Sequence, residues 1–203
     1  RQLLIDLYDA EIRYNDEHLG AFFDALRDRD LLENSIVIVS ADHGDAFGEH
    51  GYYEHPRYLH EEITHVPLFV RPPGGLSDTV EAPVSTLDVV ATIEGIVGRE
   101  RELSLLGSQD ADRRVFSQAR GENDHSALRR YAVRTQTDAC LCERDVDTGA
   151  IEFTHSTDPS LRSELEAHVD ERVRVENGEE PAGDGTAVDA DIERRLSALG
   201  YKE

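Results

Sequence analysis

A run of β-branched residues at 35–41 (SIVIVSA) limits most strongly what this chain can fold into. Because the run is apolar almost throughout, rather than at every second position, it predicts a strand covered on both faces, as in the parallel sheet of an α/β layer. The run ends abruptly at residues 42–51 (DHGDAFGEHG), where acids, histidines and glycines replace the apolar residues. Ligand sites in α/β layers gather at the carboxyl ends of strands, so we expect a site in this loop.

The segments on either side of this run continue the α/β pattern. Apolar residues recur at three- and four-residue spacing over residues 2–29, which predicts an amphipathic helix. A second apolar run at 66–70 (VPLFV) predicts a strand that ends at the turn sequence RPPGG. Residues 83–98 predict a short strand followed by a helix.

The pattern changes after residue 104, where short alternating segments replace the helix and strand pairs. We therefore expect residues 1–104 to form an α/β core, and residues 105–203 to form a subdomain with a small antiparallel sheet and terminal helices. The strands expected in this subdomain are residues 113–119, 130–137, 139–146 and 150–155, and the helices start at Pro159 and near residue 189.

The chain is strongly acidic, with 43 Asp and Glu against 21 Lys and Arg and a formal net charge of −22. Nucleic acids and anionic membranes are polyanions, so this charge argues against either as a partner. The acids could form a surface that steers substrates, or they could be an adaptation to high salt that keeps the protein hydrated. Because they are spread along the whole chain, we favour the halophilic interpretation and expect folding to need salt.

The sequence contains no apolar run long enough to cross a bilayer and no signal-peptide pattern. Its two cysteines, Cys140 and Cys142, share a face of an expected strand, and their spacing predicts a reduced pair rather than a disulfide. Since there is neither a disulfide framework nor an N-x-S/T sequon, we expect a cytoplasmic location.

Asp42 and His43 come directly after the apolar run, where both side chains can reach one centre. A carboxylate and an imidazole together make half of a divalent-metal site. Glycines at 44, 48 and 51 allow the loop to fold back closely. The alternative is a local turn in which Asp42 only caps nearby amides, and the spacing alone leaves both interpretations open.

Three ordered segments carry a resemblance to a known family: YDAEIRYNDEHLGAFFDALRDRDLLENSIVIVSADHGDAFGEHG, THVPLFVRPPG and VSTLDVVATIEGIVG. They resemble the C-terminal half of a sulfatase in the alkaline-phosphatase-like superfamily. The resemblance implies part of an α/β sandwich with a small C-terminal antiparallel sheet plus helix. It also implies a hydrolase with one divalent metal held at Asp42 and His43. Calcium is the metal that the family implies, and manganese or zinc are alternatives because imidazole is a softer ligand.

The family carries a Lys or His shortly after the GEHG loop, where it holds the anionic ester. This chain has no lysine there, and the resemblance assigns that role to His55, as a catalytic group that assists the leaving oxygen. Arg57 is the second cation, and His50 lies near enough to bind substrate. The alternatives are that His55 ties down a loop and that His50 packs the turn.

The nucleophile motif of sulfatases, C-x-P-x-R or S-x-P-x-R, is absent, as is the early pair of metal-binding acids. We therefore expect the chain to begin about halfway through a larger enzyme, to need an N-terminal half as its partner, and to be inactive alone. The expected substrate is a small-molecule or glycan sulfate ester. A phosphoester or phosphonate hydrolase or a phosphoglycerol-type transferase of the same superfamily is the close alternative. A non-catalytic acidic metal-binding module is the alternative of another class.

Overall fold

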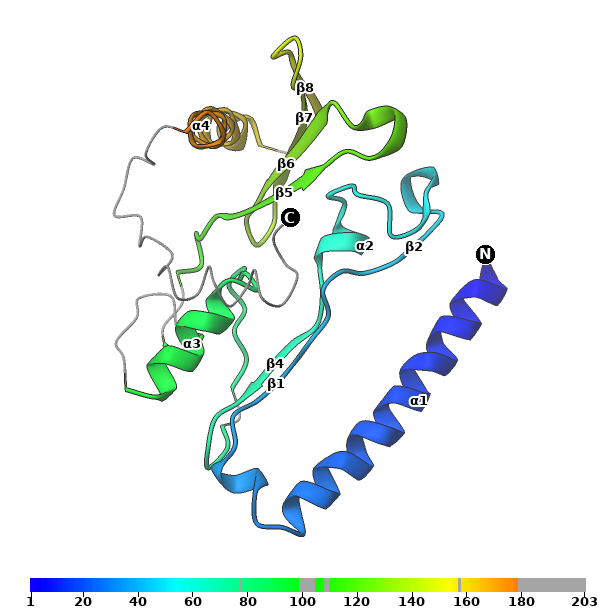
Figure 1. The fold of residues 1–203 in the computed structure, drawn as a ribbon, viewed down its shortest axis with the longest axis vertical. Helices are drawn as coiled ribbons and strands as arrows, with labels where there is room; N and C mark the ends of the chain where they lie inside the picture. The colour runs from blue at the N-terminus through cyan, green and yellow to red at the C-terminus, as the bar shows by residue number, and fades with distance from the viewer. Residues whose placement is uncertain (77, 99–104, 108–109, 157, 179–203) are drawn as a thin grey trace. The chain divides into compact units, whose positions relative to one another are not determined.

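Figure 1 shows the computed structural model, which describes residues 1–76, 78–98, 105–107, 110–156 and 158–178. The chain divides into two compact units, Arg1–Arg162 and Ser163–Glu203. The domain boundary expected after residue 104 adjoins residues outside the described part and stays a prediction. The helix expected near residue 189 also lies outside the described residues. None of the helices in the described ranges is both long and apolar enough to cross a bilayer.

The first element is the long helix α1 (Gln2–Arg27), which confirms the helix expected at 2–29. None of its residues is buried. Tyr8 packs edge-on against Phe47, with ring centroids 5.2 Å apart, and Arg1 forms an ion pair with Glu49. These contacts connect the start of α1 to the loop that follows the first strand. The apolar side chains that remain exposed along α1 include Leu3, Leu4, Leu7, Ile12, Leu19 and Phe22.

A 3-10 turn, η1 (Leu32–Asn34), leads into strand β1 (Val37–Ser40), which pairs with β4 (Leu68–Arg71). Both strands were expected, but the pairing is antiparallel, with Ile38 opposite Val70. The expectation that β1 is covered on both faces of a parallel sheet is wrong for the part of the chain that the structure describes, because β1 is only half-buried. An apolar run reports burial and not strand direction, and here the chain turns back to run beside β1.

The segment after β4 turns at Pro72 and continues to helix α3 (Asp88–Ile96). Residues 83–87 form no strand, contrary to expectation, because their polar groups bond to the start of α3 instead. The Asp88 carboxylate accepts the Ser85 N–H at 2.8 Å, and the Ser85 hydroxyl accepts the Leu87 N–H at 3.2 Å. These two bonds fold residues 85–87 into a turn at the start of α3. Arg113 donates to both oxygens of Asp88, at 2.6 and 2.7 Å, and this pairing raises the pKa of Arg113.

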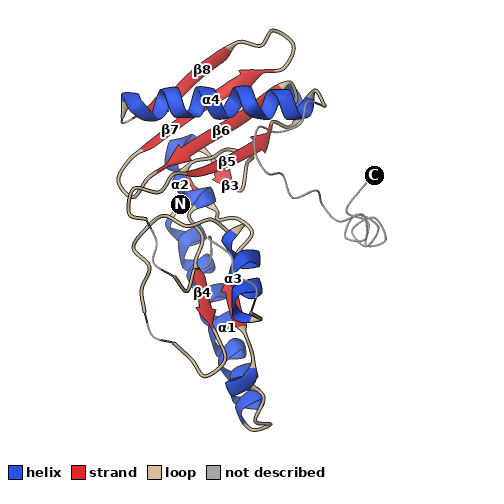
Figure 2. Ribbon diagram, turned by 90° about the vertical axis from the view of Figure 1, so that its left-hand side faces the viewer, coloured by secondary structure: helices blue, strands red, loops and turns tan. Residues whose placement is uncertain are grey.

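Four antiparallel strands form the second sheet in the order β5-β6-β7-β8, which confirms the strands expected there. Figure 2 shows them side by side. Tyr131 and Val133 face Cys142 and Cys140 across one face of the sheet, where all four are buried. On the other face, Ala132 and Leu141 form a small core with Leu59 from an earlier loop. The strands are β5 (Val115–Arg120), β6 (Leu128–Arg134), β7 (Ala139–Asp145) and β8 (Ile151–Ser156), and the 3-10 turn η3 (Asn123–His125) follows β5.

The last described helix is α4 (Pro159–Glu176), which starts at the proline as expected. Asp158 caps it, because its carboxylate accepts the Ser160 N–H and the Ser160 hydroxyl, both at 2.8 Å. These bonds favour the charged carboxylate and lower the pKa of Asp158.

Candidate active site

The loop after β1 leads into a small hairpin formed by β2 (Ala46–Phe47) and β3 (Tyr53–Glu54), which the 3-10 turn η2 (Glu49–Gly51) joins. Gly48 has φ 102°, a conformation that glycine adopts without strain. Gly44 lies directly against helix α2 (Glu61–Thr64), where its N–H donates to the Ile63 carbonyl at 2.9 Å. A Cβ at this position would lie 2.1 Å from the Glu62 carbonyl oxygen. The loop can therefore pass this close to α2 only with glycine at position 44.

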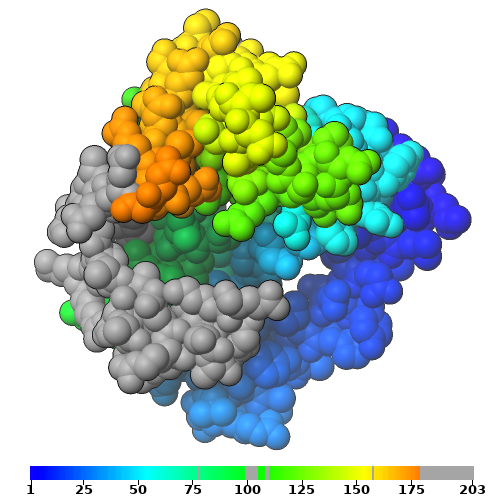
Figure 3. All heavy atoms as spheres, turned by 45° about the horizontal axis from the view of Figure 1, so that its top comes forward, coloured from blue at the N-terminus to red at the C-terminus, as the bar shows by residue number. Residues whose placement is uncertain are grey.

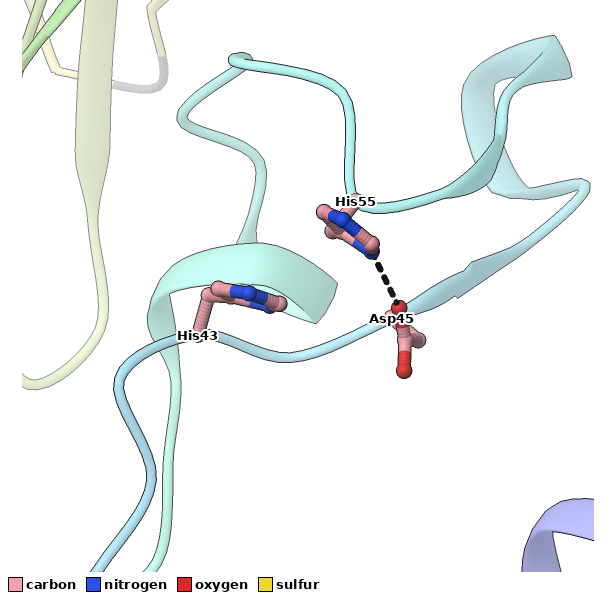
Figure 4. A group of neighbouring side chains, drawn as sticks. All are labelled: His43, Asp45 and His55. Carbon is pink, nitrogen blue, oxygen red and sulfur yellow. Dashed lines mark hydrogen bonds and ion pairs between the residues drawn. The ribbon is translucent and has the colours of Figure 1, made fainter.

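Three side chains converge between this loop and the residue that follows β3. His43, Asp45 and His55 each offer a ligand atom, and these atoms all lie within 4.8 Å of one another. Figure 4 shows that His43 and Asp45 come from the segment leading into β2, while His55 reaches them from the chain just beyond β3. The His43 and His55 rings are stacked, with centroids 4.5 Å apart. His55 Nδ1 lies 3.2 Å from Asp45 Oδ1.

Asp42 borders this group without belonging to it. Its side chain is 90% exposed, and its Oδ2 lies 3.8 Å from His43 Nε2. Its other oxygen, Oδ1, accepts the His43 N–H at 3.1 Å, which is the local capping contact considered as the alternative. The structure therefore brings Asp42 beside His43, and the roles of both as metal ligands stay predictions.

Asp45 is a candidate residue that sequence reasoning missed. The signal was available, because positions 43 and 45 are two residues apart and share one side of an extended backbone. The DHGD sequence thus offers two potential ligands on one side, in addition to the adjacent pair at 42 and 43.

His50 and Arg57, expected to bind substrate, lie outside the His43–Asp45–His55 group. His50 Nδ1 lies 2.9 Å from Glu62 Oε1, and its ring stacks on His60 with centroids 3.8 Å apart. Arg57 Nε lies 3.6 Å from Glu122 Oε2. Each side chain therefore has an acidic partner within this chain, and a role in binding substrate stays a prediction for both.

Tyr52, Tyr58 and His60 form a stack of aromatic rings. The Tyr52 and Tyr58 centroids are 4.2 Å apart, and the Tyr58 and His60 centroids are 5.9 Å apart. Burial and the nearby His50 lower the pKa of His60. The hydrogen bond with Tyr52 raises the pKa of Tyr58. All three rings are partly buried.

The donor atoms of the group fit a divalent cation. Two imidazoles and one carboxylate resemble the ligands that manganese and zinc accept, whereas calcium prefers oxygen ligands throughout. The exposed carboxylate of Asp42 could add a further oxygen. The group is thus suited to a divalent metal, and its two imidazoles favour manganese or zinc over calcium.

The sulfatase family model matches residues 3–98, which include the whole candidate site. The chain is 32% identical over 101 residues to the uncharacterized sulfatase YidJ of Escherichia coli (strain K12), covering 50% of this chain and 20% of that protein. It is 33% identical over 91 residues to the choline-sulfatase of Rhizobium meliloti (strain 1021), covering 45% and 18%. It is 38% identical over 76 residues to human iduronate 2-sulfatase, covering 37% and 14%.

Solved sulfatase structures resemble this fold over most of the chain. BT1596, a 2-O GAG sulfatase, aligns with a TM-score of 0.57 at 18% identity, covering 92% of this chain and 42% of that one. A putative sulfatase yidJ from Bacteroides fragilis aligns with a TM-score of 0.52 at 19% identity, covering 78% and 38%. These likenesses confirm the predicted fold class, an α/β fold of the alkaline-phosphatase-like type with a small antiparallel sheet plus helix. The aligned region spans about a fifth of the first curated relatives.

Proposed function

We propose that this chain, whose residues 3–98 match the sulfatase family, is the C-terminal portion of a metal-dependent sulfatase that hydrolyses sulfate esters. The observation that carries the proposal is the convergence of His43, Asp45 and His55 in the loop after β1, within the matched residues. Neither strand of the hairpin could hold this group alone. An arrangement of two imidazoles and a carboxylate at the end of a strand is suited to ester hydrolysis.

Asp42 and His43 would hold one divalent cation, with Asp45 as a further ligand. A bound cation would supply Lewis-acid polarisation of the sulfate oxygens. Calcium is the ion that the resemblance implies, and the imidazole of His43 supports manganese or zinc as alternatives.

His55 would protonate the leaving alcohol oxygen. Its Nδ1 faces Asp45, so the carboxylate holds the ring in one orientation and leaves Nε2 to carry the transferred proton. Arg57 and His50 would bind the sulfate group if their contacts with Glu122 and Glu62 open when substrate enters.

The nucleophile would come from an N-terminal portion of the same enzyme, because no C-x-P-x-R or S-x-P-x-R motif occurs here. The substrate would be a small-molecule or glycan sulfate ester, since the relatives include a choline-sulfatase and an iduronate 2-sulfatase. We propose a cytoplasmic location, with neither nucleic acid nor membrane as a partner, on the grounds of charge and composition.

The test is an assay of the intact gene product that contains this chain, in molar KCl, with 4-nitrophenyl sulfate and 4-nitrophenyl phosphate as substrates. We expect turnover of the sulfate, and His55→Ala to lower kcat by roughly 10²- to 10⁴-fold, as for loss of a general acid. The matched control is His65→Ala, since His65 is exposed and lies outside the group. Faster turnover of the phosphate would move the enzyme to the phosphoryl branch of the superfamily. No turnover of either ester would favour a non-catalytic module.

A further inference from the structure

Two arginines of β6 bind the backbone of the loop that follows His55. Arg130 Nη1 donates to the Arg57 carbonyl at 3.0 Å, and Arg134 Nη2 donates to the Leu59 carbonyl. The two arginines lie four positions apart in β6, and side chains alternate between the two faces of a strand, so positions 130, 132 and 134 share one face of the sheet. They contact the loop two and four residues after His55.

Arg130 is held rigidly enough to act as an anchor. Only 4% of the residue is exposed. Its Nε donates to Glu143 Oε1 at 2.6 Å, and Glu143 is its direct partner across the β6–β7 ladder. Its guanidinium also lies over the Tyr58 ring, 3.9 Å from the centroid. This planar cation is fixed at three points. If it moved, its buried charge would lose its partners, which is energetically costly.

The contacts from the sheet cover three successive residues of the loop. Arg130 binds the carbonyl of Arg57 and the ring of Tyr58, and Leu59 packs on Ala132 between the two arginines. Figure 3 shows this loop, in cyan, lying directly against the green segment of the sheet. The arginine hydrogen bonds therefore lie on either side of the apolar contact between Leu59 and Ala132, and together they fix the position of the loop along the sheet.

The other end of the loop is weakly held. The β2–β3 hairpin has only the pairs Ala46–Glu54 and Phe47–Tyr53, and Glu54, directly before His55, has a φ of 64°. A hairpin this short is marginal on its own. The position of His55 must then depend on the anchor that follows it in the chain.

We propose that Arg130 and Arg134 are positioning residues for His55, through which the sheet β5–β8 holds the loop at 55–60 so that His55 reaches Asp45 and His43. The part of this inference that concerns catalysis rests on the proposed function. The geometric part does not, because the position of His55 can be measured without any substrate.

The experiment compares Arg130→Met with Arg129→Met in the intact gene product. Arg129 neighbours Arg130 in β6 but lies on the opposite face, where it bonds to the carbonyls of Ser126 and Leu128. The first readout is the imidazole NMR signals of His55, assigned by their loss in His55→Ala. We expect them to shift in Arg130→Met and to stay unchanged in Arg129→Met. Unchanged His55 signals in folded Arg130→Met would overturn the proposal, whether or not the enzyme turns over sulfate esters.

The second readout is turnover of 4-nitrophenyl sulfate. A displaced His55 should lower kcat by about 10- to 100-fold and leave KM within about twofold, because the substrate is bound by other groups.

If Arg130→Met fails to fold, Glu143→Gln and Arg130→Lys test the positioning role instead, since both keep the volume of the buried cluster. Glu143→Gln loosens only the anchor, and Arg130→Lys keeps the charge but loses the forked contacts, so both should give smaller His55 shifts in the same direction. No shift in either would overturn the proposal. No sulfate turnover in the unmodified enzyme, together with a shifted His55, would refute the proposed function and leave the positioning role standing.

Discussion

His55 Nδ1 lies 3.2 Å from Asp45 Oδ1, so the residue after β3 and the residue before β2 are paired across the open end of one hairpin. The contact joins a candidate acid to the segment that carries the candidate metal ligands. A change at either residue should therefore affect both binding and chemistry. This coupling is the basis for the first prediction.

Asp45→Asn should weaken the binding of Mn²⁺ to the protein by at least about tenfold, because it replaces a charged oxygen ligand with a neutral one. Isothermal titration calorimetry in molar KCl would measure the dissociation constant. Glu54→Gln is the matched control, since it removes an exposed acid from the same hairpin outside the group. Equal dissociation constants for Asp45→Asn and the unmodified protein would exclude Asp45 as a ligand.

Asp88→Asn should destabilise the protein by about 3 kcal/mol, because it leaves the Arg113 guanidinium without its charged partner in a buried site. Asp88 is 1% exposed and accepts both bonds from Arg113 as well as the Ser85 N–H. Urea unfolding at constant high salt would measure the change. Asp112→Asn, an exposed acid near the same arginine, should change stability by less than about 0.5 kcal/mol. Equal effects of the two substitutions would contradict the prediction.

Stability should fall on acidification below about pH 6.5, in part because of His60. Its folded-state pKa is lowered by burial and by the cations of His50, Arg134 and His155, against the opposing effect of Glu62. The unfolded chain therefore binds more protons than the folded one between the folded pKa and about 6.5, and stability rises with pH through that window. Above about pH 6.5, His60 is neutral in both the folded and the unfolded chain and no longer makes stability depend on pH.

The measurement is the free energy of unfolding at pH 7.5 and pH 5 for the protein and for His60→Gln. The variant should lose less stability between the two pH values. It should keep some loss, because burial also lowers the pKa of His168. A pH dependence that is identical in His60→Gln would argue against this residue.

The melting temperature should rise from dilute buffer to molar KCl, because a net charge of −22 repels itself and salt screens that repulsion. Differential scanning calorimetry across a KCl series would show it. Sucrose at matched osmolality provides the control, since it does not screen charge. A constant melting temperature would exclude the halophilic interpretation of the acidic composition.

The chain of 203 residues alone should not hydrolyse an aryl sulfate with any divalent metal, because it contains no nucleophile motif of the sulfatase type. Release of 4-nitrophenol from its sulfate ester would be followed in the presence of Ca²⁺, Mn²⁺ or Zn²⁺. Turnover that Asp42→Ala abolishes would show that the chain carries its own nucleophile and would overturn this expectation.

The sequence by itself determined the local elements. The spacing of apolar residues predicted α1, the apolar runs predicted β1 and β4, and alternation predicted the strands of the second sheet. It also indicated a candidate site at the end of β1, because ligand sites in α/β layers gather at the carboxyl ends of strands. These features depend on neighbours within a few residues, which a single sequence displays directly.

Only the tertiary structure decided which distant residues meet. It paired β1 with β4 in the antiparallel direction, joined Asp45 to His55, and brought Arg130 to the carbonyl of Arg57. The physical reason is common to all three. Each contact depends on the path of the chain between its two partners, and that path is fixed by packing, such as that of Leu59 on Ala132 and Leu141, rather than by local preference.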